Sequence, residues 1–504
     1  MTPYRPGAAP AGTGNAPPDA VIVGTGPNGL AAGVTLARAG LHVELYERSA
    51  TIGGGLRSVA LFDSDVIHDI CSAVHPMAAA SPFFRAFGLG GHGVELLTPD
   101  ISYAHPLPGR DAALAHRDLD AVCEHLGPDG PAWRRIMRPL LRHSEGVAAL
   151  MLSGQRVLPR DATAPSALVR SVAGLLGAVR GFSGEQAPAL LAGVAAHATG
   201  PLPSLPATAI TLLLGHLAHG TGWPLPRGGS GRIADALAAD IRAHGGVLRT
   251  GNPVNDLRDV SRAKVLLLDT GPKEFLRIAP GLLPARYAQA LRSYRYGPAA
   301  AKADFLVSQP IPWADPEVGR AGTVHLGGTR AQVFRQESLN ARGVPTDTPF
   351  VLVVDPAVTD PGRARGGRRP VWAYAHVPHG DTREPVALIR ELIERYAPGF
   401  TDTVLAAHGT APRELEAYNP NYVGGDIGCG AIDLRQSLLR PVARWNPYRT
   451  PLAGVYLCSA ATPPGPGVHG MSGYLAAVSV LRREFGIRTP PSLGTPGVVG
   501  APAR

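Results

Sequence analysis

The first strong hydrophobic pattern in the chain is the apolar run of residues 20–23, which a glycine-rich turn and then a helical pattern follow. The pattern predicts a strand over Ala20–Val23 and a helix over Leu30–Ala39 that ends at Gly40. A second strand is predicted over His42–Tyr46. The order strand, helix, strand is typical of an α/β fold with a parallel sheet.

The same kind of pattern returns in two later stretches. Four residues with three glycines, 228–231, precede a helix that has Ile233, Leu237 and Ile241 at helical spacing. Further strands are predicted over Gly246–Thr250, Ala263–Asp269 and Gly454–Cys458, and a last helix over Tyr474–Leu481.

The remaining segments have a different character. Residues 106–227 are predicted to be mainly helical and residues 300–436 to be rich in strands. The strand predictions there cover Lys302–Val307, Thr323–Gly327, Val351–Asp355 and Val371–His376.

The spacing G-x-G-x-x-G occurs three times, beginning at Gly24, Gly88 and Gly465, but the first alone follows a predicted strand and opens a helix. In that context Gly24 permits a tight turn, Gly26 lets the backbone approach a pyrophosphate, and Gly29 allows close packing of helix and strand. The start of the helix offers unpaired N–H groups to phosphates. The alternative is a glycine-rich loop in an ordinary α/β sheet.

Glu47 ends the second strand, 23 residues after Gly24. An acid at this distance accepts hydrogen bonds from ribose hydroxyls, which favours an unphosphorylated adenosine ribose. The segment therefore predicts a dinucleotide site of the Rossmann type.

Downstream residues resemble a known flavoprotein family. Arg48 and the run Gly53-Gly54-Gly55-Leu56-Arg57-Ser58 resemble the second glycine motif of the amine oxidase and phytoene desaturase flavoproteins. The resemblance extends over about residues 20–485 and is greatest to the carotenoid oxidoreductase branch, especially the bacterial relatives of pyridine nucleotide-disulfide oxidoreductase domain-containing protein 2. Further blocks that carry it are 68–84, 322–328, 448–451 and 462–473.

The resemblance implies FAD as the cofactor and assigns residues to it. Arg48, Gly53, Gly54 and Arg57 would approach the FAD diphosphate and the flavin. Val254 would hold the adenine through its backbone. Gly467, Gly470 and Met471 belong to the C-terminal turn that would touch the flavin. Two departures stand in that region: Ser459-Ala460 replaces the usual Gly-Asp or Gly-Glu, and Pro466 replaces a glycine.

These assignments define the expected domains. We expect a discontinuous Rossmann-type FAD-binding domain of residues 20–105, 228–300 and 437–490, with an interleaved α+β substrate or cap domain of residues 106–227 and 301–436. Residues 1–19 are expected to be a disordered tail and residues 491–504 a flexible tail.

By the same resemblance three histidines would lie near the flavin: His469, His75 and His325. Each has a side chain able to act as a general acid or base near neutral pH. For each, the alternative is a structural histidine bonded to backbone carbonyls.

The leading functional hypothesis is an FAD-dependent dehydrogenase, desaturase or oxidase that transfers a hydride from an apolar, polyene-like substrate to flavin N5. One alternative is a flavin-dependent double-bond isomerase without net redox chemistry, and another is a lipid- or prenyl-binding protein on the same fold. The electron acceptor is expected to be oxygen or a quinone. NADH and NADPH are expected to be poor reductants, since no second nucleotide motif has the required context.

The composition limits the kinds of binding partner and the cellular location that we expect for the chain. The net charge is +9, but 45 of the 48 basic residues are arginine and no dense basic run occurs, so nucleic-acid binding is not expected. Four scattered cysteines and no ligand-like histidine pattern predict neither a disulfide framework nor a metal site. The chain has no apolar segment typical of a signal peptide, so a cytoplasmic location is expected.

The stretch Ala187–Gly222 is unusually apolar and is interrupted by prolines. It predicts a bent helical pair, which is either ordinary core, the wall of an apolar substrate tunnel, or a surface that docks on a membrane. The last alternative suggests peripheral contact with the inner face of the membrane.

Overall fold

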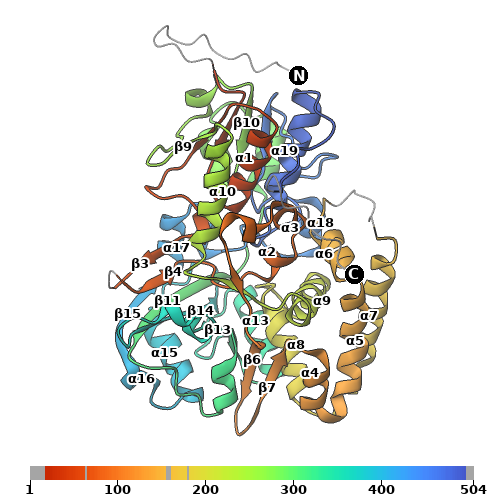
Figure 1. Cartoon of the computed structure of the whole chain (residues 1–504), viewed down its shortest axis with the longest axis vertical. Helices are drawn as coiled ribbons and strands as arrows, with labels where there is room; N and C mark the ends of the chain where they lie inside the picture. Colours follow the sequence, from red (N-terminus) through yellow and green to blue (C-terminus); the bar gives the residue numbers. More distant parts are fainter. Residues whose placement is uncertain (1–16, 63–64, 155–160, 179–180, 495–504) are drawn as a thin grey trace.

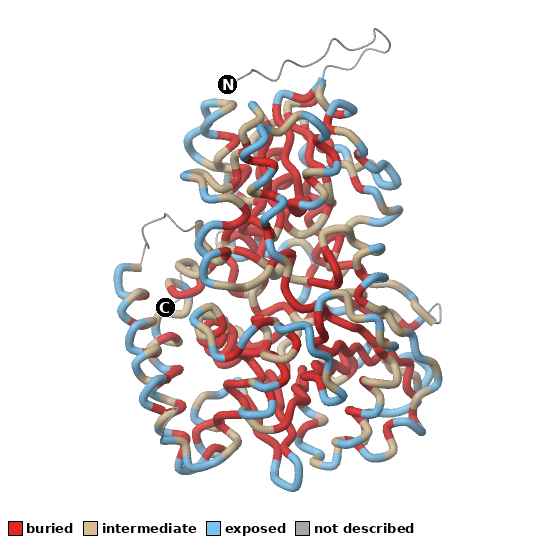
Figure 2. Tube along the Cα trace, turned by 180° about the vertical axis from the view of Figure 1, so that it is seen from behind, coloured by how far each residue is buried: buried red, intermediate tan, exposed pale blue. Residues whose placement is uncertain are grey.

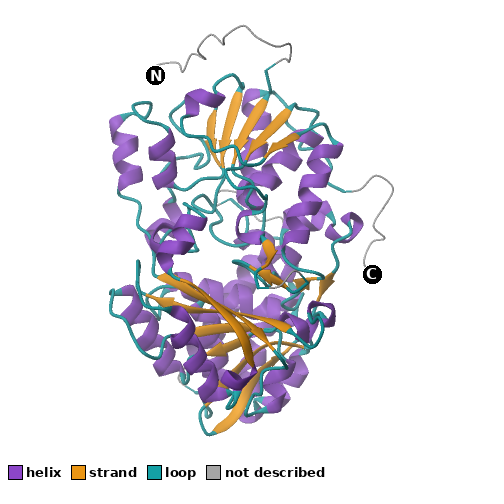
Figure 3. Cartoon of the chain, turned by 90° about the vertical axis from the view of Figure 1, so that its left-hand side faces the viewer, coloured by secondary structure: helices purple, strands orange, loops and turns teal. Residues whose placement is uncertain are grey.

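The computed structural model describes residues 17–62, 65–154, 161–178 and 181–494. Residues 1–16 and 495–504 of the predicted tails lie outside the described residues. The prediction of a flexible tail from residue 491 is wrong for its first residues, because Leu493 is buried in the core and the Gly494 carbonyl accepts a hydrogen bond from Arg38 at 2.8 Å. The described chain forms two lobes, with one large sheet in each (Figures 1 and 3). Buried segments run through both lobes, as Figure 2 shows.

The upper lobe in Figure 3 contains a parallel sheet of five strands. Its order is β16 (Val455–Leu457), β10 (Val265–Leu268), β1 (Ala20–Val23), β2 (Val43–Tyr46) and β9 (Val247–Arg249). The chain order 3-2-1-4-5 across the sheet matches the first five strands of the Rossmann order 3-2-1-4-5-6. The predicted fold class is confirmed, and the three predicted segments of the domain each supply strands.

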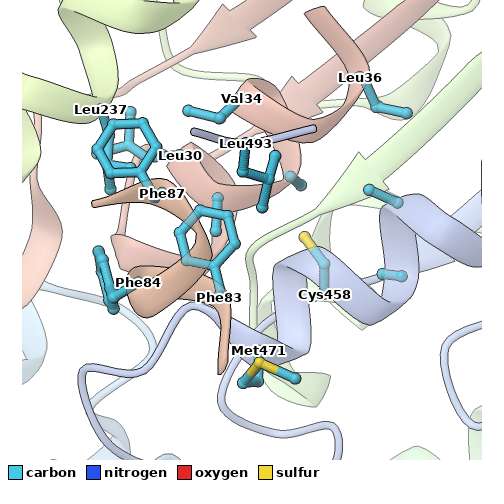
Figure 4. Packing of buried hydrophobic residues seen from close by; sticks show 14 of the residues in the cluster. Leu30, Val34, Leu36, Phe83, Phe84, Phe87, Leu237, Cys458, Met471 and Leu493 are labelled. Atoms are coloured by element: carbon cyan, nitrogen blue, oxygen red, sulfur yellow. The ribbon is translucent and has the colours of Figure 1, made fainter. Parts of the chain in front are cut away.

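Three helices pack around this sheet: α1 (Pro27–Arg38), α10 (Gly231–Ala243) and α19 (Met471–Glu484). Helix α1 begins three residues before its predicted start, because Pro27 occupies a first-turn position where a missing N–H costs nothing. Leu30 of α1 and Leu237 of α10 pack with Phe83 and Phe87 of α3 (Pro82–Phe87) in the close-up of Figure 4.

The lower lobe contains a seven-stranded sheet. Its order is β15 (Val404–Thr410), β11 (Ala299–Val307), β14 (Arg369–Val377), β13 (Val351–Val354), β12 (Val324–Leu326), β6 (Ile101–Leu107) and β7 (Arg110–His116). Strands β6 and β12 are parallel, and the other pairs are antiparallel. The expected domain boundary at residue 105 lies inside β6, which pairs within this sheet.

Helices cover the lower sheet. Six helices follow β7 in the described chain: α4 (Leu119–His125), α5 (Gly130–Arg142), α6 (Ser144–Met151), α7 (Ala164–Ala178), α8 (Gln186–Ala196) and α9 (Leu205–His219). Helix α8 is buried along almost its whole length and packs on β6 and β7, so it belongs to the core and not to a docking surface. Among the described residues, no helix is both long and apolar enough to cross a membrane.

Two pairs of short strands and nine further helices complete the described fold. The strands are β3 (Ser58–Ala60) paired with β4 (Ile67–Asp69), and β5 (Leu96–Leu97) paired with β8 (Leu225–Pro226). The helices are α2 (Pro76–Ala80), α11 (Pro272–Ile278), α12 (Ala285–Arg292), α13 (Arg330–Ala341), α14 (Pro356–Thr359), α15 (Pro385–Tyr396), α16 (Phe400–Thr403), α17 (Pro412–Tyr418) and α18 (Leu434–Leu439).

Candidate cofactor and substrate site

A cavity of about 1230 Å³ lies between the two lobes. Its wall includes the glycine-rich turn after β1 at one end and side chains from β13, β14 and α9 of the lower lobe at the other. Pockets for one small molecule typically measure about 300–1,000 Å³. The volume is therefore enough for a cofactor together with a substrate.

The turn after β1 is as tight as the glycine spacing predicts. Gly24 has φ +101°, and a Cβ on Gly29 would lie 2.3 Å from the Gly24 carbonyl oxygen. Gly24 and Gly26 line the cavity, whereas Gly29 lies behind the turn, where it allows the close packing expected of it. The backbone of this turn is therefore open to a ligand at the N-terminus of α1.

Glu47 lines the cavity beside this turn, at the end of β2. Its Oε2 accepts hydrogen bonds from the Thr25 hydroxyl at 2.6 Å and the Thr25 amide at 3.2 Å. Its Oε1 accepts one from the Ser49 amide at 2.9 Å and lies 3.1 Å from Nη2 of Arg57. The carboxylate is thus held in place facing the cavity.

The second glycine segment touches the first. A Cβ on Gly54 would lie 3.1 Å from the Cα of Gly26, so the two segments approach at van der Waals distance. Gly54, Arg48 and Arg57 line the cavity, and the Arg57 guanidinium stacks 5.3 Å from the centroid of the Tyr418 ring. Gly53 stays outside the cavity wall, and its amide donates to the Thr25 carbonyl at 3.0 Å.

Val254 lines the same end of the cavity. Its carbonyl accepts a hydrogen bond from Nη2 of Arg277 at 3.4 Å. Two glycine segments, one acid, two arginines and this apolar residue therefore meet at one end of a single cavity.

Asp269, which sequence reasoning passed over as the last residue of a predicted strand, belongs to this end too. Its Oδ2 accepts a hydrogen bond from the Gly29 amide at 3.0 Å, and its side chain would lie 2.6 Å from a Cβ on Gly26. Burial raises the pKa of this carboxyl to about 7, and the nearby charge of Glu47 contributes to the rise. The signal available in the sequence was an acid at the carboxyl end of a buried strand.

The C-terminal turn contributes Pro466, Gly467 and Val468 to the cavity wall, but Gly470 and Met471 lie behind it. His469 is fully buried and also lies outside the wall. Its Nδ1 accepts from the Met471 amide at 3.0 Å, and its Nε2 donates to the Gly465 carbonyl at 3.0 Å. Both ring nitrogens are thus occupied by backbone, as in the structural alternative stated above.

His75 does line the cavity. The Ser230 hydroxyl donates to the Ser72 carbonyl at 2.6 Å, so at 2.8 Å it accepts the Nε2 proton of His75. The Nδ1 atom of His75 is left as a buried acceptor without a protein partner. Burial lowers the pKa of this histidine to about 4.

His325 lies one layer behind the cavity wall, and His197 of the α8–α9 connection stands in front of it. Their Nε2 atoms are 3.2 Å apart. Burial lowers the pKa of His197 to about 3, and it holds the pKa of His325 well below its ordinary value. No pattern in the sequence indicated that His197 lines the cavity and contacts His325.

The wall at the other end of the cavity is mainly apolar and aromatic. It includes Met77, Leu213, Leu214, Leu352, Trp372 and Tyr374. Behind Trp372 lies Lys302, which is buried, ion-paired with Asp304, and 6.0 Å from the Trp372 ring centroid. Helix α9 of the predicted apolar stretch is thus a cavity wall.

Comparison with known proteins shows which proteins this chain resembles in sequence and fold. The model of the NAD(P)-binding Rossmann-like domain matches residues 22–87. A solved oxidoreductase from Methanosarcina mazei aligns with a TM-score of 0.58 at 15% identity, over 92% of this chain and all of that one. Cyclohexylamine oxidase from Brevibacterium oxydans aligns with a TM-score of 0.53 at 14% identity, over 93% and 100%. The chain has the amine-oxidase fold.

One relative that matches the chain over nearly its whole length is pyridine nucleotide-disulfide oxidoreductase domain-containing protein 2 of Rattus norvegicus. It is 25% identical, over 92% of this chain and 93% of the relative. The resemblance inferred from the motifs is thus supported for this group, whereas a specific relation to phytoene desaturase is not.

The residues of this amine-oxidase fold suit a dinucleotide. Asn28, in the first turn of α1, lines the cavity and has a buried Oδ1 without a protein partner, so this oxygen is available to accept a hydrogen bond from a ligand. The Arg57 guanidinium and the helix start suit a diphosphate, and Glu47 suits a ribose. In the described residues no group of three or more histidine, cysteine, aspartate or glutamate side chains is arranged to hold a metal ion.

Proposed function

We propose that this chain is an FAD-dependent oxidoreductase that dehydrogenates an apolar substrate. The observation that carries the proposal is the single cavity that runs from the two glycine segments and Glu47 to an apolar, aromatic wall. A dinucleotide lying along the first end would place its reactive ring toward the second.

FAD is favoured over a nicotinamide cofactor by the contact between Gly54 and Gly26. A nicotinamide dinucleotide needs the first glycine turn but not the second segment. The solved proteins of this fold include an oxidoreductase and an amine oxidase, and the full-length relative is named as an oxidoreductase-domain protein. These names agree with redox chemistry.

The charge distribution supports an apolar substrate rather than an amine. Four acidic residues of the described chain line the cavity: Glu47, Asp269, Glu274 and Glu416. The first two belong to the cofactor end, Glu274 pairs with Arg277, and Glu416 pairs with Lys273. No free carboxylate thus remains beside Leu213, Leu352 and Trp372 to balance a substrate ammonium.

The chain's own residues would bind and orient the substrate in this proposal. FAD, when bound, supplies the acceptor for a hydride from a substrate C–H bond. Trp372 and Tyr374 would hold the substrate and exclude water. With pKa values of about 4 and 3, His75 and His197 are neutral at pH 7, so they offer hydrogen-bond acceptors and not a proton. The proposed electron acceptor is oxygen or a quinone, and the proposed location is peripheral on a membrane.

Cofactor retention tests the proposal. Purified protein is expected to be yellow and to release FAD, not FMN, on denaturation. Glu47→Arg is expected to lose FAD, because it removes the ribose acceptor and places a cation beside Arg57. Glu391→Arg, an exposed change of the same charge on α15, is the control and should retain FAD. Retention of NAD with no flavin after reconstitution would overturn the assignment.

A further inference from the structure

Large apolar side chains are exposed on α18, at the start of α9 and in the chain segment that follows α18. Leu434, Leu438 and Leu439 of α18 are exposed, Trp445 just beyond it is 84% exposed, and Leu205 at the start of α9 is 70% exposed. We call these five residues the α9–α18 patch. Helices α9 and α18 pack against each other, and Figure 1 shows them on the same side of the molecule.

The patch is the outer side of helices that also form the cavity wall. Pro206, next to Leu205, lines the cavity, as do Ser437 and Arg440, which flank Leu438 and Leu439. Along α9 the wall continues inward through Ala209, Ile210 and Leu213. The exposed apolar surface is therefore continuous in the chain with the apolar end of the substrate cavity.

We propose that the α9–α18 patch docks on an anionic phospholipid bilayer and takes the substrate from it. This inference rests on the proposed function, since an apolar substrate of the kind inferred partitions into lipid. Leucine and tryptophan are the side chains that bind the interface of a bilayer, with tryptophan at the headgroup level.

Charge around the patch fits an anionic surface. Arg435 is exposed on the same helix as the leucines. The acid next to the patch, Asp433, is paired with Arg295 at 2.7 Å. Basic residues near a membrane surface are attracted to anionic lipids. The net charge of +9 acts in the same direction.

A bilayer suits the size of the patch better than a second protein does. A stable protein interface uses about 20–30 residues on each side, whereas the patch has five large apolar side chains. A protein seated there would also cover the helices through which substrate enters. A second copy of this chain is therefore the outcome that the experiment has to separate.

Vesicle flotation of the flavin-loaded protein tests this proposal. The probe is vesicles of phosphatidylcholine with phosphatidylglycerol, compared with phosphatidylcholine alone. The patch variant is Leu438→Ser with Trp445→Ser. The matched control is Val169→Ser with Leu176→Ser, two apolar residues of α7 that are each 68% exposed and lie outside the patch.

Wild type and the α7 control are expected to float with the anionic vesicles, and the patch variant to partition at least about 10-fold more weakly, because apolar burial is lost. Arg435→Glu should weaken binding at low salt and not at high salt. Its control is Arg138→Glu, an exposed arginine of α5. Bound FAD, measured in every sample, separates failure of docking from failure of the proposed function.

Fluorescence gives a reading that needs no variant to fold. Trp133, Trp223 and Trp372 are buried and Trp313 is half-buried, so a blue shift of wild-type emission on adding vesicles reports chiefly on Trp445, the most exposed of the five tryptophans. Absence of flotation by wild type, equal flotation of the patch variant and its control, or a dimer in light scattering that the patch variant disrupts would overturn the proposal.

Discussion

The imidazoles of His197 and His325 meet Nε2 to Nε2 at 3.2 Å, with His197 on the cavity wall and His325 behind it. Space for this arrangement comes from Gly193 of α8. A Cβ there would lie 2.6 Å from Nδ1 of His325 and 2.9 Å from Nδ1 of His105. The absence of a side chain at one helical position thus leaves room for the rings of His325 and His105.

Gly193→Ala is therefore expected to destabilise the fold by about 1–3 kcal/mol, since it forces the buried rings apart. Gly177→Ala is the control, because a Cβ on that helical glycine of α7 meets nothing within 4 Å. The control should be neutral or stabilising by about 0.5–1 kcal/mol. Chemical denaturation measures both, and equal effects would show that the histidine pair does not depend on Gly193.

Asp269 gives the cofactor site a pH dependence. The pKa of Asp269 in the folded protein is about 7, above its ordinary value. The carboxyl therefore makes its full contribution to the stability of the fold below about pH 4, and this contribution is lost as the pH rises through 7. Asp269→Asn keeps an acceptor for the Gly29 amide without the charge. The variant should be more stable than wild type at pH 8 by on the order of 1–3 kcal/mol, with no gain at pH 4.

The same change tests FAD binding. A diphosphate at the start of α1 repels a charged Asp269, so wild-type affinity for FAD should fall as pH rises above 7, and that of Asp269→Asn should stay level. Titration of the apoprotein with FAD at several pH values measures this. A parallel pH dependence in both proteins would contradict the role given to Asp269.

Features formed by residues close together in the sequence could be predicted, whereas contacts between residues far apart in the sequence could not. The turn at Gly24 and the acid at Glu47 lie within one strand–helix–strand unit, so spacing alone predicted them. The partner of Gly29 is Asp269, 240 residues away, and the partner of His197 is His325, 128 residues away. Pairings over such distances depend on tertiary packing, which no local pattern encodes.

The predicted domain boundary illustrates the same point. Residues 101–107 follow the first Rossmann segment in sequence, yet Ala104 pairs with Val324 in the other sheet. Likewise, hydropathy marked the stretch Ala187–Gly222 as unusual but could not separate α8, which is core, from α9, which is cavity wall.

Reduced pyridine nucleotides are expected to be poor reductants. The NAD(P)-binding Rossmann-like match covers residues 22–87, which is the segment assigned here to FAD. In the described residues, one parallel sheet has a glycine turn between strand and helix. Anaerobic mixing with NADH and NADPH measures flavin bleaching, and rapid stoichiometric bleaching at micromolar concentration would contradict this prediction.

Acid should unfold the protein steeply. Burial lowers the pKa of six histidines to about 4 or about 3, and it holds the pKa of His325 well below its ordinary value; the six are His75, His105, His197, His216, His219 and His469. A pKa depressed in the fold means that the unfolded chain takes up protons first, so stability is full above pH 6.5 and is lost toward pH 4. Each such histidine adds roughly 1.4 kcal/mol per pH unit in that window. Denaturation midpoints that stay flat between pH 6.5 and 4.5 would show that these rings charge within the fold.

His469 is expected to hold the C-terminal turn rather than to exchange protons with a substrate. Its two ring nitrogens bridge Gly465 and Met471, and its own carbonyl accepts from the Ser81 hydroxyl at 2.5 Å. His469→Ala leaves two buried backbone groups unpaired, at a cost of about 1–3 kcal/mol each. FAD should stay bound, because Gly24, Gly26 and Glu47 are untouched. With a substrate in hand, stopped-flow flavin reduction at a temperature where the variant is folded should slow by less than about 10-fold, or about 1.4 kcal/mol. If flavin reduction slows by about 100-fold or more while the variant keeps wild-type stability, His469 acts instead as a general acid or base in the reaction.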